Sequence, residues 1–322
     1  MIIPADAIGL MCRSIFDLKK TEDKRQEVDT SKKRSRAVII ILLVLVVALT
    51  SFCVFLLLRS RDGATEIKED LRKYGDGLFS WHDEIFDAEE REDFFRMMKE
   101  QGLTELYQDV PFNKSASSIK ELVSECEQNG VRLYLLVGEP EWALDKSAVK
   151  LRTEIQRAAL MGFSGVMVDV EPGSTDEWKD DRGPVMETMT KMLLRGKAAA
   201  EENGIEMIVC LSYYYDDYGF EDELEEIVEN GCDSLAIMNY DRADEIGQIE
   251  NEAALCKKYG KRLINIYELQ EVGKYGLEES HTYREAGLSA LKESAEKLID
   301  HYSGMKISTS LHDYRALKAM TE

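Results

Sequence analysis

Two acidic residues stand at the end of an apolar run in the segment GFSGVMVDVEPG, residues 162–173. Side chains alternate between the two faces of a β-strand, so Asp169 and Glu171 share one face and the intervening valines share the other. Two carboxylates held close together do not both ionise freely, and one of them retains a proton near neutral pH. The spacing therefore predicts a general acid. The alternative is a pair of solvated loop acids at a strand end.

A second segment, SLAIMNYDR, residues 234–242, also ends an apolar run with polar groups. By the same alternation Met238 and Tyr240 face one way, and Asp241 lies at the rim. Met238, Tyr240 and Asp241 are therefore candidate site residues at this strand end, with Met238 as a substrate contact.

Aromatic residues are concentrated in the segments that follow the predicted strands. Aromatic faces stack on the apolar faces of sugars, so these residues suit a carbohydrate groove, although they could equally pack the loops onto the fold. Trp81 and Tyr213 are the preferred sugar contacts. The full set is Trp81, Trp142, Trp178, Tyr213, Tyr214, Tyr215 and Tyr218.

Other acids and histidines occupy similar positions. Asp109, Glu139 and Glu268 follow predicted strands two, three and seven, and we expect Asp109 and Glu268 to bind substrate. A retaining glycosidase that uses Glu171 and Glu268 as its two carboxylates is a rival interpretation. No HxxxH or HExxH spacing is present, so we expect no metal. A metal site in the same region would have to be built from His82, Asp109, Asp169 and His312.

A glycine that ends a helical pattern and precedes an apolar run recurs along the chain, as expected for alternating helices and strands. With the strand expected at GLFSW, residues 77–81, the repeats make eight strands, which predicts a (β/α)8 barrel over residues 77–322. A doubly wound sheet is the competitor, but the glycine-rich phosphate loop typical of that fold is absent. The repeating glycines are Gly102, Gly130, Gly162, Gly204, Gly231, Gly260 and Gly304.

The two motifs, at strands four and six, resemble those of the family 18 glycoside hydrolases, the chitinase and endo-β-N-acetylglucosaminidase group, which carry D-x-x-D-x-D-x-E and M-x-Y-D. The resemblance implies a TIM barrel that hydrolyses bonds next to an N-acetylhexosamine with help from the acetamido group of the substrate. Glu171 would protonate the leaving oxygen, and Asp169 would orient the acetamido nitrogen. Tyr240 would donate a hydrogen bond to the acetamido oxygen, and Asp241 would bind sugar hydroxyls. No cofactor is implied.

The sequence departs from that family pattern at three places. Ser164 and Met167 stand where the motif has its first two aspartates. The family tends to place a tryptophan after the eighth strand, whereas the corresponding segment here is SLHDYRAL, with His312 and Tyr314. These departures leave open a catalytically inactive carbohydrate-binding protein.

Residues 37–58 form an uncharged apolar run that is long enough to cross a bilayer as one helix. Thirty-six mostly polar residues precede it, unlike a secretory signal peptide. Within about 20 residues of the run, eight lysines and arginines lie before it and five lie after it. We therefore expect a cytoplasmic tail (1–36), a transmembrane helix (37–58), a linker (59–76) and an extracytoplasmic barrel at the plasma membrane. A cleaved signal peptide is the minor alternative.

The net charge of −21 makes a nucleic-acid partner unlikely on electrostatic grounds, because phosphate backbones are held by positive charge. The expected partner is an oligo- or polysaccharide that contains N-acetylhexosamine. A module that docks another exported protein through its acidic surface is a further alternative. The four cysteines after residue 58 have no CxxC spacing and are expected to be buried thiols.

Overall fold

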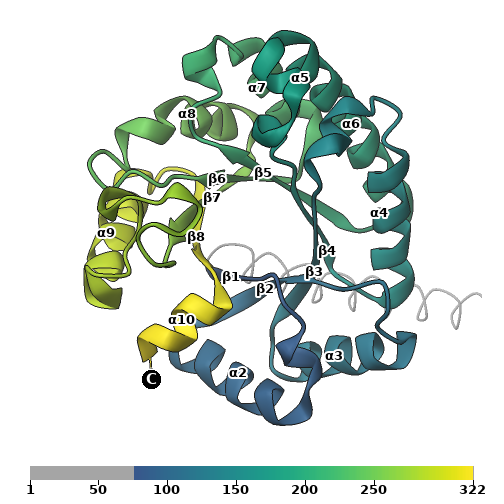
Figure 1. Cartoon of the computed structure of the whole chain (residues 1–322), viewed down its shortest axis with the longest axis vertical. Helices are drawn as coiled ribbons and strands as arrows, with labels where there is room; N and C mark the ends of the chain where they lie inside the picture. Colours follow the sequence, from purple (N-terminus) through teal and green to yellow (C-terminus); the bar gives the residue numbers. More distant parts are fainter. Residues whose placement is uncertain (1–75, 322) are drawn as a thin grey trace, which may run out of the picture. The chain divides into compact units, whose positions relative to one another are not determined.

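The computed structural model describes residues 76–321, which form a closed barrel of eight parallel strands in the order β1 to β8 (Figure 1). The barrel closes where Gly77 and Leu78 of β1 pair with Ser310 and Leu311 of β8. The predicted (β/α)8 fold is therefore confirmed. The strands are β1 (Asp76–Ser80), β2 (Leu103–Asp109), β3 (Arg132–Val137), β4 (Gly165–Asp169), β5 (Glu206–Ser212), β6 (Ser234–Met238), β7 (Arg262–Glu268) and β8 (Lys306–His312).

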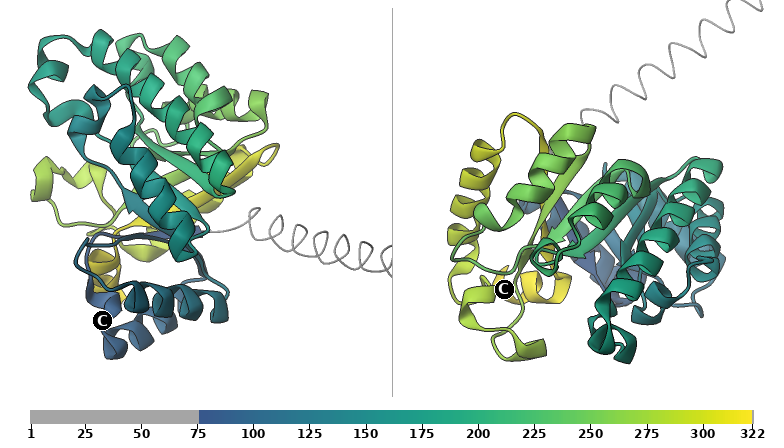
Figure 2. Two further views of the ribbon diagram at one scale, coloured as in Figure 1. Left: turned by 90° about the vertical axis from the view of Figure 1, so that its right-hand side faces the viewer. Right: turned by 90° about the horizontal axis from the view of Figure 1, so that it is seen from above.

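Helices cover the outside of the barrel, as the two further views in Figure 2 show. The link from β4 to β5 carries two α-helices, and the link from β7 to the next α-helix is a long segment that holds only short 3₁₀ turns. The helices are α2 (Ala88–Glu100), α3 (Ala116–Gln128), α4 (Val149–Met161), α5 (Asp176–Asp180), α6 (Arg182–Asn203), α7 (Glu221–Glu226), α8 (Glu250–Tyr259), α9 (Gly287–His301) and α10 (Tyr314–Thr321).

Two apolar clusters lie on the two sides of the strands, as the alternation of side chains requires. Val166, Val168 and Val170 belong to the cluster that the helices cover. Met167 belongs to the cluster inside the barrel, which also contains Tyr107. The inward direction predicted for the acids of β4 follows from this register.

Most of the repeating glycines end helices in the left-handed conformation, which other residues adopt only at a cost. Gly162 ends α4 with φ of 92°, and Gly204 ends α6 with φ of 68°. Gly231 ends a π-helical turn instead.

Within residues 76–321 no helix is long and apolar enough to span a bilayer. The predicted transmembrane helix (37–58), tail (1–36) and nearly all of the predicted linker (59–76) lie outside the described residues, so the anchor remains a prediction. The four cysteines expected to be buried thiols are buried and unpaired: Cys126, Cys210, Cys232 and Cys256.

Candidate active site

The carboxyl end of β4 places Asp169 inside the barrel and Glu171 two residues further along, at the mouth. Asp169 is buried, whereas Glu171 is exposed. The end of β3 lies unusually close to this strand, because a Cβ atom at Gly138 would stand 1.8 Å from the carbonyl oxygen of Asp169. Glycine at position 138 therefore allows the backbone of Asp169 to take its position.

The two carboxyl groups favour retention of a proton. Burial raises the pKa of Asp169. Burial and then the charge of Asp169 raise the pKa of Glu171 to about 7. Glu171 remains open to solvent at the cavity mouth, which argues for a smaller effect of burial, but the neighbouring charge acts in the same direction. A carboxyl group in this setting can serve as a general acid near neutral pH.

A thiol occupies the inner side of the pair. Cys210 of β5 hydrogen-bonds Asp169, and burial raises the pKa of Cys210 well above its usual range, so it is present as S–H. Met167 lies two residues before Asp169 on the same face of β4, and its side chain has no hydrogen-bond donor to offer the Asp169 carboxyl group. The Oδ1 atom of Asp169 is buried and has no hydrogen-bond partner within residues 76–321. One face of this carboxyl group is thus left for a ligand.

Tyr240 follows β6 and faces the same space. Its pKa is raised well above the usual range by burial, and then by nearby Glu268, Cys210, Asp169 and Glu171. The phenol is therefore neutral and able to donate a hydrogen bond.

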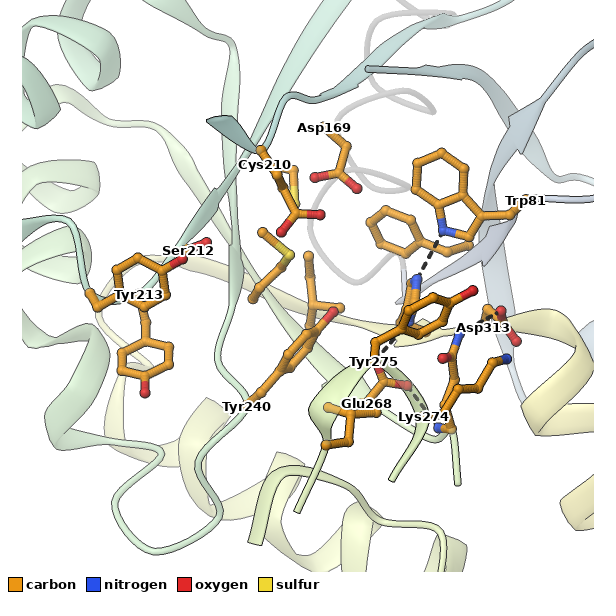
Figure 3. Close-up of a pocket in the computed structure, with 18 of the residues that line it drawn as sticks. Trp81, Asp169, Cys210, Ser212, Tyr213, Tyr240, Glu268, Lys274, Tyr275 and Asp313 are labelled. Atoms are coloured by element: carbon orange, nitrogen blue, oxygen red, sulfur yellow. Dashed lines mark hydrogen bonds and ion pairs between the residues drawn. The ribbon is translucent and has the colours of Figure 1, made fainter. Parts of the chain in front are cut away.

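A cavity of about 470 Å³ joins these groups at the carboxyl ends of the strands. In Figure 3, Trp81, Asp169, Tyr240 and Glu268 surround this space. Cavities at this end of a TIM barrel are the usual location of active sites. Of the residues predicted from sequence, those that line the cavity are Trp81, Asp169, Glu171, Tyr213, Met238, Tyr240 and Glu268.

Two predicted substrate contacts are not among the residues that line the cavity. Asp241 accepts hydrogen bonds from the backbone N–H of Ala243 at 2.9 Å and from Nε2 of Gln248 at 3.1 Å, so it orders the loop after β6. Asp109 is half-buried at the end of β2, where burial raises its pKa and Arg157 opposes that effect. Glu139 is also outside the cavity lining.

The predicted aromatic cluster divides into two groups. Tyr213 lines the cavity together with Tyr214. Trp178 is instead buried against Tyr215, with ring centroids 5.6 Å apart. Trp142 packs against the outer apolar cluster.

Glu268 is held in place by three hydrogen bonds. Its Oε1 accepts from the backbone N–H groups of Leu269 at 2.9 Å and Gln270 at 2.7 Å. Its Oε2 lies 2.9 Å from Nδ1 of His312, and Nε2 of His312 accepts from the indole N–H of Trp81 at 2.9 Å. The dashed lines in Figure 3 trace this chain.

Several cavity residues were not assigned to the site from sequence. His312 was weighed only as a metal ligand or a loop residue, and Cys210 only as a buried thiol. Strand alternation could have placed both, because His312 ends β8 and Cys210 lies next to Asp169 in the β4–β5 register. Lys274 and Tyr275 also line the cavity. They lie in the long link after β7, where no repeating pattern of apolar residues indicates which way a side chain points.

Within residues 76–321, no group of three or more histidine, cysteine or acidic side chains is arranged to hold a metal ion. The site considered from His82, Asp109, Asp169 and His312 is therefore not formed as a metal-binding cluster.

Comparison with solved structures places the fold among TIM barrels that include glycosidases. A plant class V chitinase mutant from Cycas revoluta in complex with (GlcNAc)3 has a TM-score of 0.51 and 12% identity, covering 76% of this chain and 96% of that one. A chitinase from Chromobacterium violaceum has a TM-score of 0.48 and 13% identity, covering 76% and 98%. The catalytic domain of a β-amylase from Paenibacillus polymyxa has a TM-score of 0.49 and 8% identity, covering 76% and 93%.

The likeness to the Cycas revoluta chitinase shows the barrel fold alone, because one barrel supports many reactions. No protein-family model matches the sequence, and no curated protein matches it either.

Proposed function

We propose that this protein is a membrane-anchored glycoside hydrolase that cleaves bonds next to an N-acetylhexosamine, with the acetamido group of the substrate as nucleophile. The observation that carries the proposal is the convergence of Asp169, Glu171 and Tyr240 on one cavity. The raised pKa of Glu171 suits it to donate a proton. The neutral phenol of Tyr240 suits it to donate a hydrogen bond that holds the acetamido oxygen in line for attack.

The reaction divides into two steps. In the first, Glu171 protonates the glycosidic oxygen while the acetamido carbonyl oxygen attacks the anomeric carbon, so the leaving sugar departs as an alcohol and a cyclic oxazolinium ion forms. Asp169 accepts a hydrogen bond from the acetamido N–H, and Tyr240 holds the carbonyl oxygen in line. In the second, water attacks the anomeric carbon, the bond from that carbon to the acetamido oxygen breaks and the acetamido group re-forms, and the water gives its proton to the Glu171 carboxylate, which restores the enzyme.

This chain would control Asp169 differently from the family it resembles. Met167 replaces the inner aspartate, so the Cys210 thiol is the polar neighbour of Asp169. A thiol is a weak donor, which leaves the pKa of Asp169 raised by burial. The substrate N–H would supply the stronger hydrogen bond when it binds.

The rival pair of Glu171 and Glu268 is less well supported. A nucleophilic carboxylate needs a free oxygen aimed at the anomeric carbon. Both oxygens of Glu268 already accept hydrogen bonds, two from backbone N–H groups and one from His312. We therefore assign Glu268 a positioning role in the site and no direct part in the reaction.

The deciding experiment measures turnover and binding of N-acetylglucosamine oligomers by the full chain. Glu171→Gln preserves shape and removes the proton donor, so kcat is expected to fall by roughly 10²–10⁴-fold while binding survives. Glu139→Gln, a strand-end acid outside the cavity lining, is the matched control and should retain turnover.

The alternatives have distinct outcomes. Binding without turnover in wild type and variant alike would identify a carbohydrate-binding protein without activity. Recovery of a Glu268→Ala variant by added azide would indicate a carboxylate nucleophile. Tight binding of a thiazoline analogue of the cyclic intermediate would support attack by the acetamido group.

A further inference from the structure

The chain of hydrogen bonds from Glu268 through His312 to Trp81 links the ends of three strands across the cavity wall. The Trp81 indole N–H donates to Nε2 of His312, and Nδ1 of His312 lies beside Oε2 of Glu268, each at 2.9 Å. The His312 side chain is 17% exposed and that of Glu268 is 3% exposed. Within residues 76–321, His312 is the hydrogen-bond partner of the Trp81 indole N–H.

The donors and acceptors in this chain require one form of the histidine ring. An indole nitrogen can only donate, so Nε2 of His312 must be an unprotonated acceptor. The ring proton then lies on Nδ1 and points to Glu268, whose carboxylate can only accept. A doubly protonated ring would set two N–H groups against each other at Nε2, and the bond to Trp81 would be lost.

We propose that Glu268 and His312 are a positioning pair that clamps the Trp81 indole at the cavity wall, and that protonation of His312 releases the clamp. The use of Trp81 as a sugar platform rests on the proposed function, whereas the clamp itself does not. The Trp81 indole thus lies beside the end of β8, within hydrogen-bond distance of His312.

The charges around His312 favour its protonated form and so favour release of the clamp. Burial favours the neutral ring, but the hydrogen bond and charge of Glu268 outweigh it and raise the pKa of His312 above its ordinary value of 6.5. The clamp is therefore closed above that pKa and open below it. The charged and titratable groups that face the ring or line the same cavity are Glu268, Asp313, Asp169, Glu171, Tyr240, His82, Lys274 and Cys210.

The groups around the His312 ring determine what its protonation does to Trp81. Both nitrogens of a protonated imidazole are donors, so turning the ring would offer Trp81 no acceptor. Phe79 packs edge-on against His312, with ring centroids 5.5 Å apart. Glu268 cannot swing to follow a moving histidine, since two backbone N–H groups hold its other oxygen. When Nε2 of His312 becomes protonated, the Trp81 indole N–H therefore loses this hydrogen bond.

The test follows Trp81 directly and needs no substrate. The chain has three tryptophans, so the full-length protein labelled with 5-fluorotryptophan should give three ¹⁹F resonances, of which Trp81→Phe identifies one. We expect the Trp81 resonance to shift between pH 5 and 9 with a single midpoint above 6.5. Trp142 and Trp178 serve as internal controls and should not follow that midpoint.

Three variants assign the titration. His312→Gln should abolish the shift, and Glu268→Gln should lower its midpoint, because the charge that favours the protonated ring is gone. Glu171→Gln, which removes a different titrating group in the cavity, should leave the shift in place. A Trp81 resonance that does not titrate in wild type, or that titrates equally in His312→Gln, overturns the proposal. Absence of glycosidase activity would leave these spectra unaffected, so the two proposals fail separately.

Discussion

At the scale of single residues, the protonation of Glu171 sets the predicted pH dependence. Burial and the charge of Asp169 raise the pKa of Glu171 to about 7, so the acid form is present below that value and is lost above it. We expect kcat/KM to decline on the alkaline side with one ionisation near pH 7, measured on an unactivated N-acetylglucosamine oligomer.

Asp169→Asn tests the origin of that ionisation. Removing the neighbouring charge takes away one of the two causes that raise the pKa of Glu171, so the alkaline decline of the residual activity should move to lower pH. An alkaline limb that stays in the same place in Asp169→Asn would assign it to another group.

The residues that sequence could place are those governed by strand alternation. Asp169, Glu171 and Tyr240 were predicted to face inward, and all three line the cavity. Asp109 ends β2 and Asp241 lies in the loop after β6, but neither side chain lines the cavity. The loop hydrogen bonds of Asp241 and the Arg157 charge near Asp109 come from residues that no short pattern connects to the site.

At the scale of elements, the close approach of β3 and β4 predicts a specific requirement at Gly138. A Cβ atom there would overlap the Asp169 carbonyl, so Gly138→Ala must displace the end of β4. Because small misplacements of reacting groups are costly, we expect turnover to fall by roughly 10²-fold, with a lower Tm. Enzyme assays and thermal unfolding of the full chain measure both effects.

Gly173→Ala is the matched control. It lies just after the same strand, and an added Cβ would have no neighbour within 4 Å. Equal losses in the two variants would mean that the flexibility of glycine, rather than the close approach at position 138, is what the site needs.

Helix α8 carries a second prediction, because Glu252 on this helix is fully buried. Burial raises its pKa to about 8, and Asp216 and Asp217 add to that effect. Between the ordinary carboxyl pKa of about 4.5 and that value, the unfolded chain is ionised while the folded one holds its proton. The contribution of Glu252 to stability therefore declines as pH rises through this range.

We expect Glu252→Gln to raise stability by roughly 1–3 kcal/mol at pH 8 and to have little effect at pH 5. The Tm of the full chain at the two pH values measures the difference. Glu250→Gln, an exposed acid on the same helix, is the control. A Glu252→Gln variant with an unchanged pH dependence of Tm would show that the carboxyl group is ionised in the folded protein.

The elements themselves were largely predictable, for a physical reason. Each glycine that ends a helix precedes a short apolar strand, so the repeat follows from local backbone preferences. The long link after β7 was not predictable in this way. Its course over the cavity depends on tertiary contacts such as the hydrogen bond from the backbone N–H of Arg242 to the carbonyl of Ser280.

At the scale of the whole molecule, the barrel interior has different chemistry at its two ends. The carboxyl ends of the strands hold the cavity, and a middle layer is filled by apolar side chains such as Tyr107 and Met167. Buried charges occupy the amino-terminal ends, where Glu105 pairs with Arg132 and Arg262. Sequence could place these charges on strands, but their mutual pairing depends on β2, β3 and β7 meeting across a closed barrel.

This arrangement predicts that stability and activity respond separately to changes at the amino-terminal end. Glu105 is fully buried, and Arg262 donates to its two oxygens at 2.6 and 3.1 Å. The charges of Arg262 and Arg132 outweigh burial and lower the pKa of Glu105, so its stabilising effect is present at neutral pH and is lost as pH falls through that lowered value. Glu105→Gln would remove the carboxylate that pairs with buried Arg262, and would leave Arg132 with Glu206, 3.3 Å away, as its remaining acidic partner.

We expect Glu105→Gln to destabilise the protein by roughly 3–5 kcal/mol at pH 7, with the difference from wild type shrinking in acid. Thermal unfolding of the full chain at several pH values measures this effect. Glu201→Gln removes an exposed carboxylate from Lys197, which keeps its ion pair with Asp233, and should change Tm little by comparison. Because the cavity lies at the other end of the barrel, kcat/KM per folded molecule should be retained in Glu105→Gln. A variant that keeps its Tm but loses activity would instead mean that the buried charges act on the cavity through the apolar layer between them.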